Sequence, residues 1–167
     1  MNFLILSTIF IFTVILCPPF GFSQNTIPAE TVIVIDGDTI IMMIEGKKEW
    51  VDLLAIDAPE PTQPWGVVSQ NALKTLVEGK QIHIEFDQEK HNHEGRLWGY
   101  LWAGETLVNH AMVLNGYALW DFWPPNARYD KKLLDAEFLA RKNWQGMWKS
   151  AEPSPNDLLL QHKSPLE

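Results

Sequence analysis

The stretch that decides the fold is residues 31–60, TVIVIDGDTIIMMIEGKKEWVDLLAIDAPE. Two β-branched runs, Thr31–Ile35 and Thr39–Ile44, flank Asp36-Gly37, a pair that favours a tight turn between strands. A short polar turn then separates the second run from a third apolar segment, Trp50–Ile56, which ends at a proline-rich stretch. The segment therefore predicts three short strands in succession.

Two further strands and three helices follow. Gln81–Asp87 alternates apolar and polar residues, which predicts a half-buried strand, and Leu97–Ala103 is the fifth strand candidate. Apolar residues at helical spacing predict helices over Val67–Glu78, Thr106–Asn115 and Tyr129–Asn143. Five strands with a helix after the third predict an α+β fold, a five-stranded OB-like barrel with about three packed helices. A generic mixed α+β domain fits the pattern nearly as well.

The chain has 167 residues, enough for one domain. Residues 3–16 are almost wholly apolar and are followed by a proline pair, which predicts a signal peptide over 1–23 and a secreted or periplasmic protein. No Lys or Arg precedes this run, so an uncleaved membrane anchor is the alternative, and a lipid-modified Cys17 is a further one. After the signal we expect a linker over 24–30, a domain over 31–149 and a flexible tail over 150–167.

Composition narrows the chemistry of the mature chain. Cys17 is the only cysteine and lies within the predicted signal, so no disulfide is expected after cleavage. The formal net charge is −8, and residues 1–23 carry none of it. A strongly acidic domain repels phosphates, which disfavours duplex DNA and anionic membranes as partners. A local field around a bound metal ion can still differ in sign from the field of the whole domain.

Carboxylates cluster where two of the predicted strands meet turns. The first segment is residues 35–39, IDGDT, and the second is residues 56–60, IDAPE. Hard cations such as calcium take carboxylate and backbone carbonyl oxygens as ligands, and a cation so held can polarise a phosphoryl oxygen while a nearby glutamate activates water. The plainer interpretation is that Asp-Gly serves a hairpin turn and that Glu60 is a solvated loop residue.

These same strings resemble a known family. Residues 35–39 and 53–60 (LLAIDAPE) are similar to the two signature segments of the thermonuclease (staphylococcal-nuclease-like) family, and Gly95-Arg96 before an aromatic strand is similar to its third. Shorter matches follow in order: Leu107-Val108-Asn109, Gly116-Tyr117-Ala118, Ala136-Glu137, Ala140-Arg141 and Gly146-Met147-Trp148. The likeness spans about residues 31–149.

The resemblance implies a calcium-dependent phosphodiesterase, an endonuclease that acts on DNA or RNA. Asp38 and Asp57 match the metal-binding carboxylates, Ala58 matches a position that contributes its backbone carbonyl, and Asp36 matches an acidic neighbour of the metal.

The resemblance also implies which residues act on the substrate. Glu60 matches the general base, and Arg96 matches one of two arginines that bind the phosphate.

The chain departs from the family at the other arginine position, which is Asp52 here. An aspartate lacks the planar fork of donors that suits phosphate oxygens, and it repels the phosphate. We therefore expect weakened cleavage, or a catalytically inactive binding module on the same barrel. Lys47 or Lys48 could replace the lost arginine, or Asp52 could join the metal cluster. Ideal strand alternation sends Asp52 and Asp57 to opposite faces, so only a twisted or bulged strand end brings both to one site.

Other features offer alternative sites. The His91–Glu94 turn holds three potential zinc ligands, although an exposed polar turn is the plainer interpretation. Most tryptophans are expected in the core, and Tyr117 and Trp120–Trp123 are the first candidates for a surface role. The expected partner is single-stranded or unstructured nucleic acid, with no stable membrane partner after signal cleavage, and the expected state is a monomer.

Overall fold

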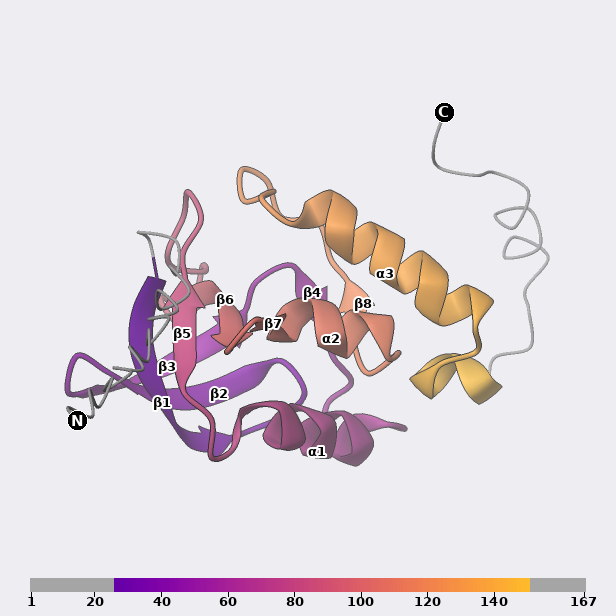
Figure 1. Cartoon of the computed structure of the whole chain (residues 1–167), viewed down its shortest axis with the longest axis horizontal. Coiled ribbons are helices and arrows are strands. Elements are labelled where there is room, and N and C mark those ends of the chain that lie inside the picture. Colours follow the sequence, from indigo (N-terminus) through magenta and orange to yellow (C-terminus); the bar gives the residue numbers. More distant parts are fainter. Residues whose placement is uncertain (1–25, 151–167) are drawn as a thin grey trace, which may run out of the picture.

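The computed structural model describes residues 26–150, and Figure 1 shows a barrel of strands with helices beside it. The barrel strands are β1 (Thr26–Val34), β2 (Thr39–Ile44), β3 (Lys47–Leu53), β5 (Ile82–Glu85) and β6 (Leu97–Ala103). They pair in the order β3-β2-β1-β5-β6, and a parallel pairing of β3 with β6 closes the barrel. The predicted α+β class, a five-stranded OB-like barrel, is confirmed.

The strand boundaries follow the sequence patterns closely at β2 and β6, which match the predicted ranges. β1 is longer than predicted, because Thr26–Ala29 pair antiparallel with β5 before the strand continues along β2. Residues 26–30, predicted as linker, are therefore strand. β3 begins at Lys47 rather than Trp50, because the two lysines of the turn pair with the end of β2.

The predicted third strand ends early and splits. After Leu53 the chain turns through Ala55, which has a positive φ of 64°, and resumes as the short strand β4 (Ile56–Asp57). β4 pairs with β8 (Leu119–Trp120), a two-residue strand that the sequence did not predict. This break interrupts the strict alternation of side chains between Asp52 and Asp57. Asp52 lines the cleft described below and Asp57 does not.

The three α-helices of the described range lie together beside the barrel. They are α1 (Gly66–Val77), α2 (Val108–Leu114) and α3 (Asp130–Lys142), and a 3-10 turn follows at Gly146–Ser150. α2 lies between α1 and α3 and packs against both (Figure 1). α2 starts later than predicted, because Thr106 and Leu107 pair with β6 as the short strand β7.

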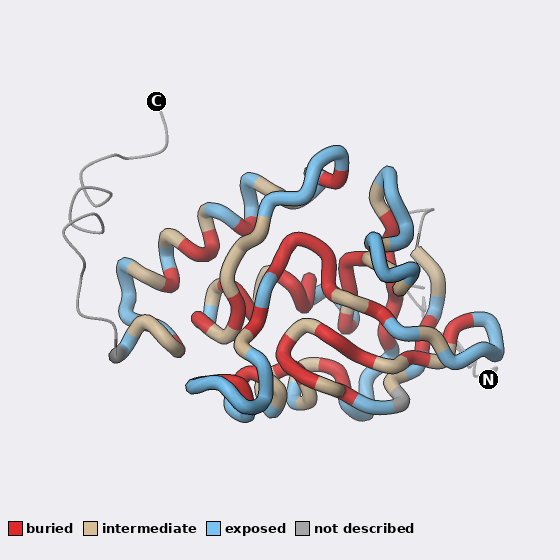
Figure 2. The backbone as a smooth tube through the Cα atoms, turned by 180° about the vertical axis from the view of Figure 1, so that it is seen from behind, coloured by how far each residue is buried: buried red, intermediate tan, exposed pale blue. Residues whose placement is uncertain are grey.

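The hydrophobic core fills the barrel and the helix interface. Figure 2 shows buried residues along the strands and inner helix faces, with the turn tips exposed. Among the largest fully buried side chains are Tyr100, Ile40, Met42, Leu53, Leu54 and Leu73. The prediction of a half-buried β5 is wrong, because all four of its residues are buried. Its polar face is covered by Trp102, Arg128 and Tyr129, which bind the buried Glu85.

A buried asparagine from α2 ties the barrel together where β3 ends. Asn109 is fully buried, its Oδ1 accepts a hydrogen bond from the Leu101 amide at 2.9 Å, and its Nδ2 donates to the Leu54 carbonyl at 2.8 Å. These bonds replace partners that the ladder cannot supply at the strand break. The segment that leads into β4 is therefore fixed relative to β6.

The predicted signal peptide and most of the predicted tail lie outside the described residues. Within residues 26–150, no helix combines the length and the apolar character that a membrane crossing requires.

Candidate active site

The loop between β1 and β2 presents two aspartates in a fixed geometry. Asp36 Oδ1 accepts hydrogen bonds from the amides of Asp38 at 3.0 Å and Thr39 at 2.6 Å. Gly37 is required here for close approach, because a Cβ on it would lie 1.9 Å from Ser69 Oγ and 2.6 Å from Ala58 Cβ. Asp36-Gly37 lies in the turn between the antiparallel strands β1 and β2, as predicted. Gly37 does not have a positive φ, and it serves packing instead.

Asp38 joins the two acidic segments of the sequence. Its Oδ2 accepts a hydrogen bond from the Ala58 amide at 2.5 Å, although the two residues are 20 positions apart. The pKa of Asp38 is raised to about 8, first by burial and then by the neighbouring Asp36 and Asp57, while the Ala58 amide opposes the shift. An ionised Asp38 is therefore costly in this setting unless a positive charge lies beside it.

Asp57 is an exposed residue of β4. A second carboxylate, Asp121, acts on it, and no sequence pattern had indicated this. Partial burial raises the pKa of Asp57, and so does the charge of Asp121. Asp121 follows β8, and Glu137 of α3 holds β8 in place by accepting a hydrogen bond from the Trp120 amide at 2.6 Å. No local pattern marks Asp121, because its position depends on the pairing of two-residue strands.

Glu60 lies on the exposed loop after β4. Its amide donates to Gln63 Oε1 at 2.9 Å, and its carbonyl accepts from the Gln63 amide at 2.8 Å, so the backbone turns tightly. Gly66 starts α1 directly against this turn, and a Cβ on Gly66 would lie 1.8 Å from the Glu60 carbonyl oxygen. The backbone that carries Glu60 is therefore packed against the first turn of a helix.

Arg96 immediately precedes β6 and contacts Asp52, which occupies the position where the family resemblance places a second arginine. Its Nη1 is 3.5 Å from Asp52 Oδ1, and its Nη2 is 3.2 Å from Glu94 Oε2. The guanidinium carbon lies 5.0 Å from the ring centroid of Trp50. Asp52 also accepts a hydrogen bond from Asn92 Nδ2 at 2.6 Å. Burial raises the pKa of Asp52, and the Arg96 charge opposes this shift.

The two lysines considered as replacements lie elsewhere. Lys47 pairs with Ile44 and Lys48 with Met43 at one end of the β2–β3 ladder, whereas Asp52 pairs with Thr39 at the other end. Four or five residues of extended strand separate them, which is roughly 15 Å.

A cleft of about 160 Å³ opens beside Asp38 and Asp52. Its lining residues are Asp38, Thr39, Asp52, Leu53, Ile56, Asn92, His93, Trp98 and Trp123. Trp98 and Trp123 meet edge to face, with ring centroids 5.4 Å apart, and Trp123 is 42% exposed. The cleft therefore combines carboxylates with an aromatic wall.

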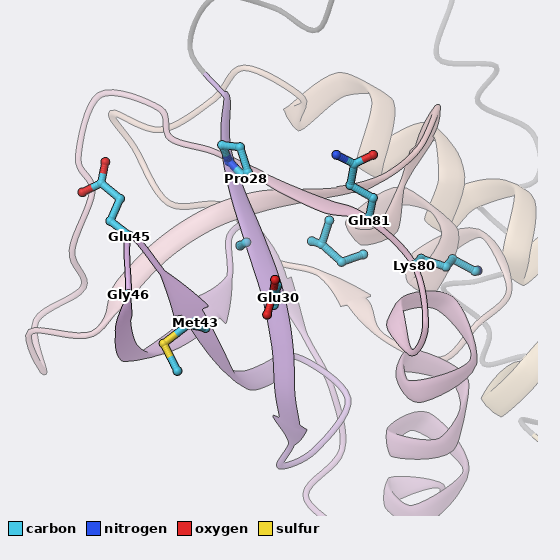
Figure 3. A pocket seen from close by; sticks show the side chains of 9 residues that line it. Pro28, Glu30, Met43, Glu45, Gly46, Lys80 and Gln81 are labelled. Atoms are coloured by element: carbon cyan, nitrogen blue, oxygen red, sulfur yellow. The ribbon is translucent and has the colours of Figure 1, made fainter.

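A wider hollow of about 590 Å³ lies at the far end of β2 (Figure 3). Its walls include Glu30, Met43, Glu45 and Lys80. Its charged groups are two carboxylates and one ammonium, which do not define a ligand class.

The oxygen atoms that could bind a metal ion come from two segments, the β1–β2 loop with Asp38 and the β4 segment with Asp57. Within residues 26–150, no three His, Cys, Asp or Glu side chains are gathered tightly enough to form a ready-made cation site, and this includes the His91–Glu94 turn. What the structure does bring together is Asp38 with Asp36, with the Ala58 backbone and with the charge of Asp57. These are hard oxygen donors, the type that calcium prefers.

The barrel, the helix inserted after β4 and the acidic loops that meet at its rim define a member of the staphylococcal nuclease family. Residues 50–150 match the family described as "Staphylococcal nuclease homologue", and the chain belongs to it. This confirms the family resemblance.

Individual relatives are similar over most of the chain. The chain is 32% identical to a protein named "Thermonuclease" from Staphylococcus intermedius over 139 residues, which cover 78% of the chain and 83% of the relative. It is 30% identical to a "Thermonuclease" from Staphylococcus hyicus over 121 residues, covering 69% and 72%. It is 35% identical to an "Uncharacterized endonuclease" from Escherichia coli O157:H7 over 130 residues, covering 77% and 82%.

Proposed function

We propose that this protein is a calcium-dependent endonuclease that hydrolyses phosphodiester bonds in DNA or RNA. The family membership and the names of the relatives support nuclease activity. The observation that carries the proposal is the hydrogen bond from the Ala58 amide to Asp38, because it holds the two acidic segments against each other.

The donor set fits a calcium ion held by Asp38 and Asp57, with the Ala58 carbonyl as a further ligand and Asp36 as an acidic neighbour. Burial and adjacent carboxylates raise the pKa of Asp38 to about 8, and a divalent cation relieves that repulsion. Asp36 has its Oδ1 committed to two backbone amides, so it acts mainly by orienting the loop. When bound, calcium supplies a Lewis acid for a phosphoryl oxygen.

The chain's own residues supply the remaining functions. Glu60, exposed on its tightly packed turn, accepts the proton of the attacking water as general base. Arg96 donates hydrogen bonds to the phosphate and stabilises the charge that develops in the transition state.

Asp52 weakens this activity in our proposal. Loss of an arginine that stabilises a phosphoryl transition state costs on the order of 10³–10⁵ in rate. Asp52→Arg should therefore raise calcium-dependent cleavage. No gain would mean that this position does not face the substrate phosphate.

The proposed substrate is single-stranded or unstructured nucleic acid. The net charge of −8 opposes binding to a long duplex, while Trp123 offers a partly exposed aromatic ring at the cleft. We further propose a monomer that is exported by a cleaved signal peptide over residues 1–23 and has no stable membrane partner.

The alternative is a binding module that does not hydrolyse its ligand. The ion pair between Asp52 and Arg96 favours it, because the arginine needed for phosphate is already paired.

One assay separates the two functions. Purified protein is incubated with a fluorescently labelled single-stranded oligonucleotide and calcium, with and without chelator, beside Glu60→Gln and the control Glu105→Gln at the exposed β6–β7 turn. Chelator-sensitive cleavage that Glu60→Gln loses and Glu105→Gln retains supports the enzyme. Calcium binding by calorimetry without cleavage supports the binding module, and neither cleavage nor calcium binding refutes the proposed site.

A further inference from the structure

Arg96 lies between two carboxylates at the edge of the cleft. Arg128 and Arg141 each hold one carboxylate at 2.5 Å, on Glu85 and Glu137, and Arg128 has a second, Asp87, at 3.7 Å. None of these residues lines the cleft. Arg96 has no contact as short as 2.5 Å: Asp52 Oδ1 lies 3.5 Å from its Nη1 and Glu94 Oε2 lies 3.2 Å from its Nη2. The carboxylates of Asp52 and Glu94 carry two negative charges against the single positive charge of Arg96, so the local net charge is negative.

The contact between Asp52 and Arg96 is built into the fold. The parallel pairing of β3 with β6 places Asp52 beside Trp98, next to the start of β6. Asn92 fixes both partners, because its Nδ2 donates to Asp52 at 2.6 Å and its Oδ1 accepts from the Arg96 amide at 3.1 Å. Trp50 covers the guanidinium from a third side.

Substrate phosphate and Asp52 require the same donors. A guanidinium presents its N–H groups in a fixed planar fork, and a phosphate oxygen takes the positions that a carboxylate oxygen occupies. Asp52 lines the cleft together with Asp38, and Arg96 lies beside this wall through its 3.5 Å contact with Asp52. A phosphate that binds Arg96 there therefore meets the competing carboxylate.

We propose that Asp52 competes with the substrate phosphate for Arg96, so that the ion pair must open before the phosphate is bound. This inference rests on the proposed nuclease function, and it differs from the simple absence of a second arginine. Asp52 is then a restraining residue, and removing its charge accelerates the enzyme without supplying any new cation.

The kinetic test compares Asp52→Asn with wild type under saturating calcium. Asparagine keeps an acceptor for Asn92 while losing the charge. We expect kcat/KM to rise about fivefold, the upper range for a partly exposed ion pair. The gain should fall below about twofold in an Arg96→Ala background, and the control Glu105→Gln, which removes one charge elsewhere, should change nothing beyond about twofold. An unchanged or lower kcat/KM for Asp52→Asn overturns the proposal, as does a gain that persists without Arg96.

A binding measurement keeps the inference separate from the proposed function. Fluorescence anisotropy of a labelled single-stranded oligonucleotide with calcium, in the Glu60→Gln background, should show about fivefold tighter binding when Asp52→Asn is added. If no variant cleaves but this tightening occurs, the nuclease proposal fails and the competition stands. If cleavage occurs without tightening or acceleration, the competition fails alone. Circular dichroism confirms that each variant is folded, and should Asp52→Asn be unfolded, Asp52→Ser replaces it with a gain in the same direction.

Discussion

The buried carboxylate of Glu85 allows a quantitative prediction about stability. Its side chain is 4% exposed and accepts hydrogen bonds from Arg128 Nη1 at 2.5 Å, Trp102 Nε1 at 2.8 Å and Tyr129 Oη at 2.9 Å. Arg128→Met removes the only cationic partner among these three donors and keeps most of the side-chain volume. Breaking a buried ion pair on one side costs about 3–5 kcal/mol in the free energy of unfolding.

The expected loss is smaller, because Arg128 is 33% exposed and two neutral donors stay with Glu85. We expect about 2–3 kcal/mol, and a fall in Tm of about 8 °C for a domain of this size. Urea unfolding followed by circular dichroism measures the change. The matched control is Lys131→Met, which removes an exposed pair with Asp135 and should change stability by less than about 0.5 kcal/mol. An Arg128→Met variant as stable as this control would refute the reasoning, since the neutral donors alone would then satisfy the buried charge.

Three further substitutions test how the site is held. Gly37→Ala places a methyl group against Ser69, so the free energy of unfolding should fall by about 1–3 kcal/mol, measured in urea, and calorimetry should show weaker calcium binding. Gly66→Ala pushes on the backbone of Glu60, so cleavage should fall on the order of tenfold or more while circular dichroism shows an intact fold. Asn109→Ala leaves two buried backbone groups without their side-chain partner, and should cost about 2–4 kcal/mol in urea unfolding.

Each of these has a result that would contradict it. Unchanged calcium affinity in a folded Gly37→Ala protein would mean that the aspartate loop does not need its close packing. Wild-type cleavage by Gly66→Ala would mean that the position of Glu60 is not critical. A neutral Asn109→Ala would mean that water replaces the lost bonds.

Several features could be predicted because they depend on neighbours in the sequence. The range of β2 follows from a β-branched run bounded by turn residues, and that of β6 from an aromatic run between a polar turn and a glycine. The acidic strings around Asp38 and Asp57 were visible for the same reason, since each is a short local pattern. The roles of these residues came from family resemblance and stay proposals.

Other features have no local signal. Burial of both faces of β5 depends on Arg128 and Tyr129, which come more than 40 residues later and cover Glu85. Asp121 was missed because only the pairing of β4 with β8 brings it near Asp57.

The sequence by itself determined the order of the five barrel strands and three α-helices, the family and the unusual aspartate at position 52, because turn residues, side-chain periodicity and residue identity are properties of short segments. Only the tertiary structure decided what Asp52 contacts. Closure of the barrel by β3 and β6 brings Asp52 within 3.5 Å of Arg96, 44 residues further along the chain. The physical reason is that an ion pair depends on distance in space, which long-range strand pairing sets and local sequence patterns do not.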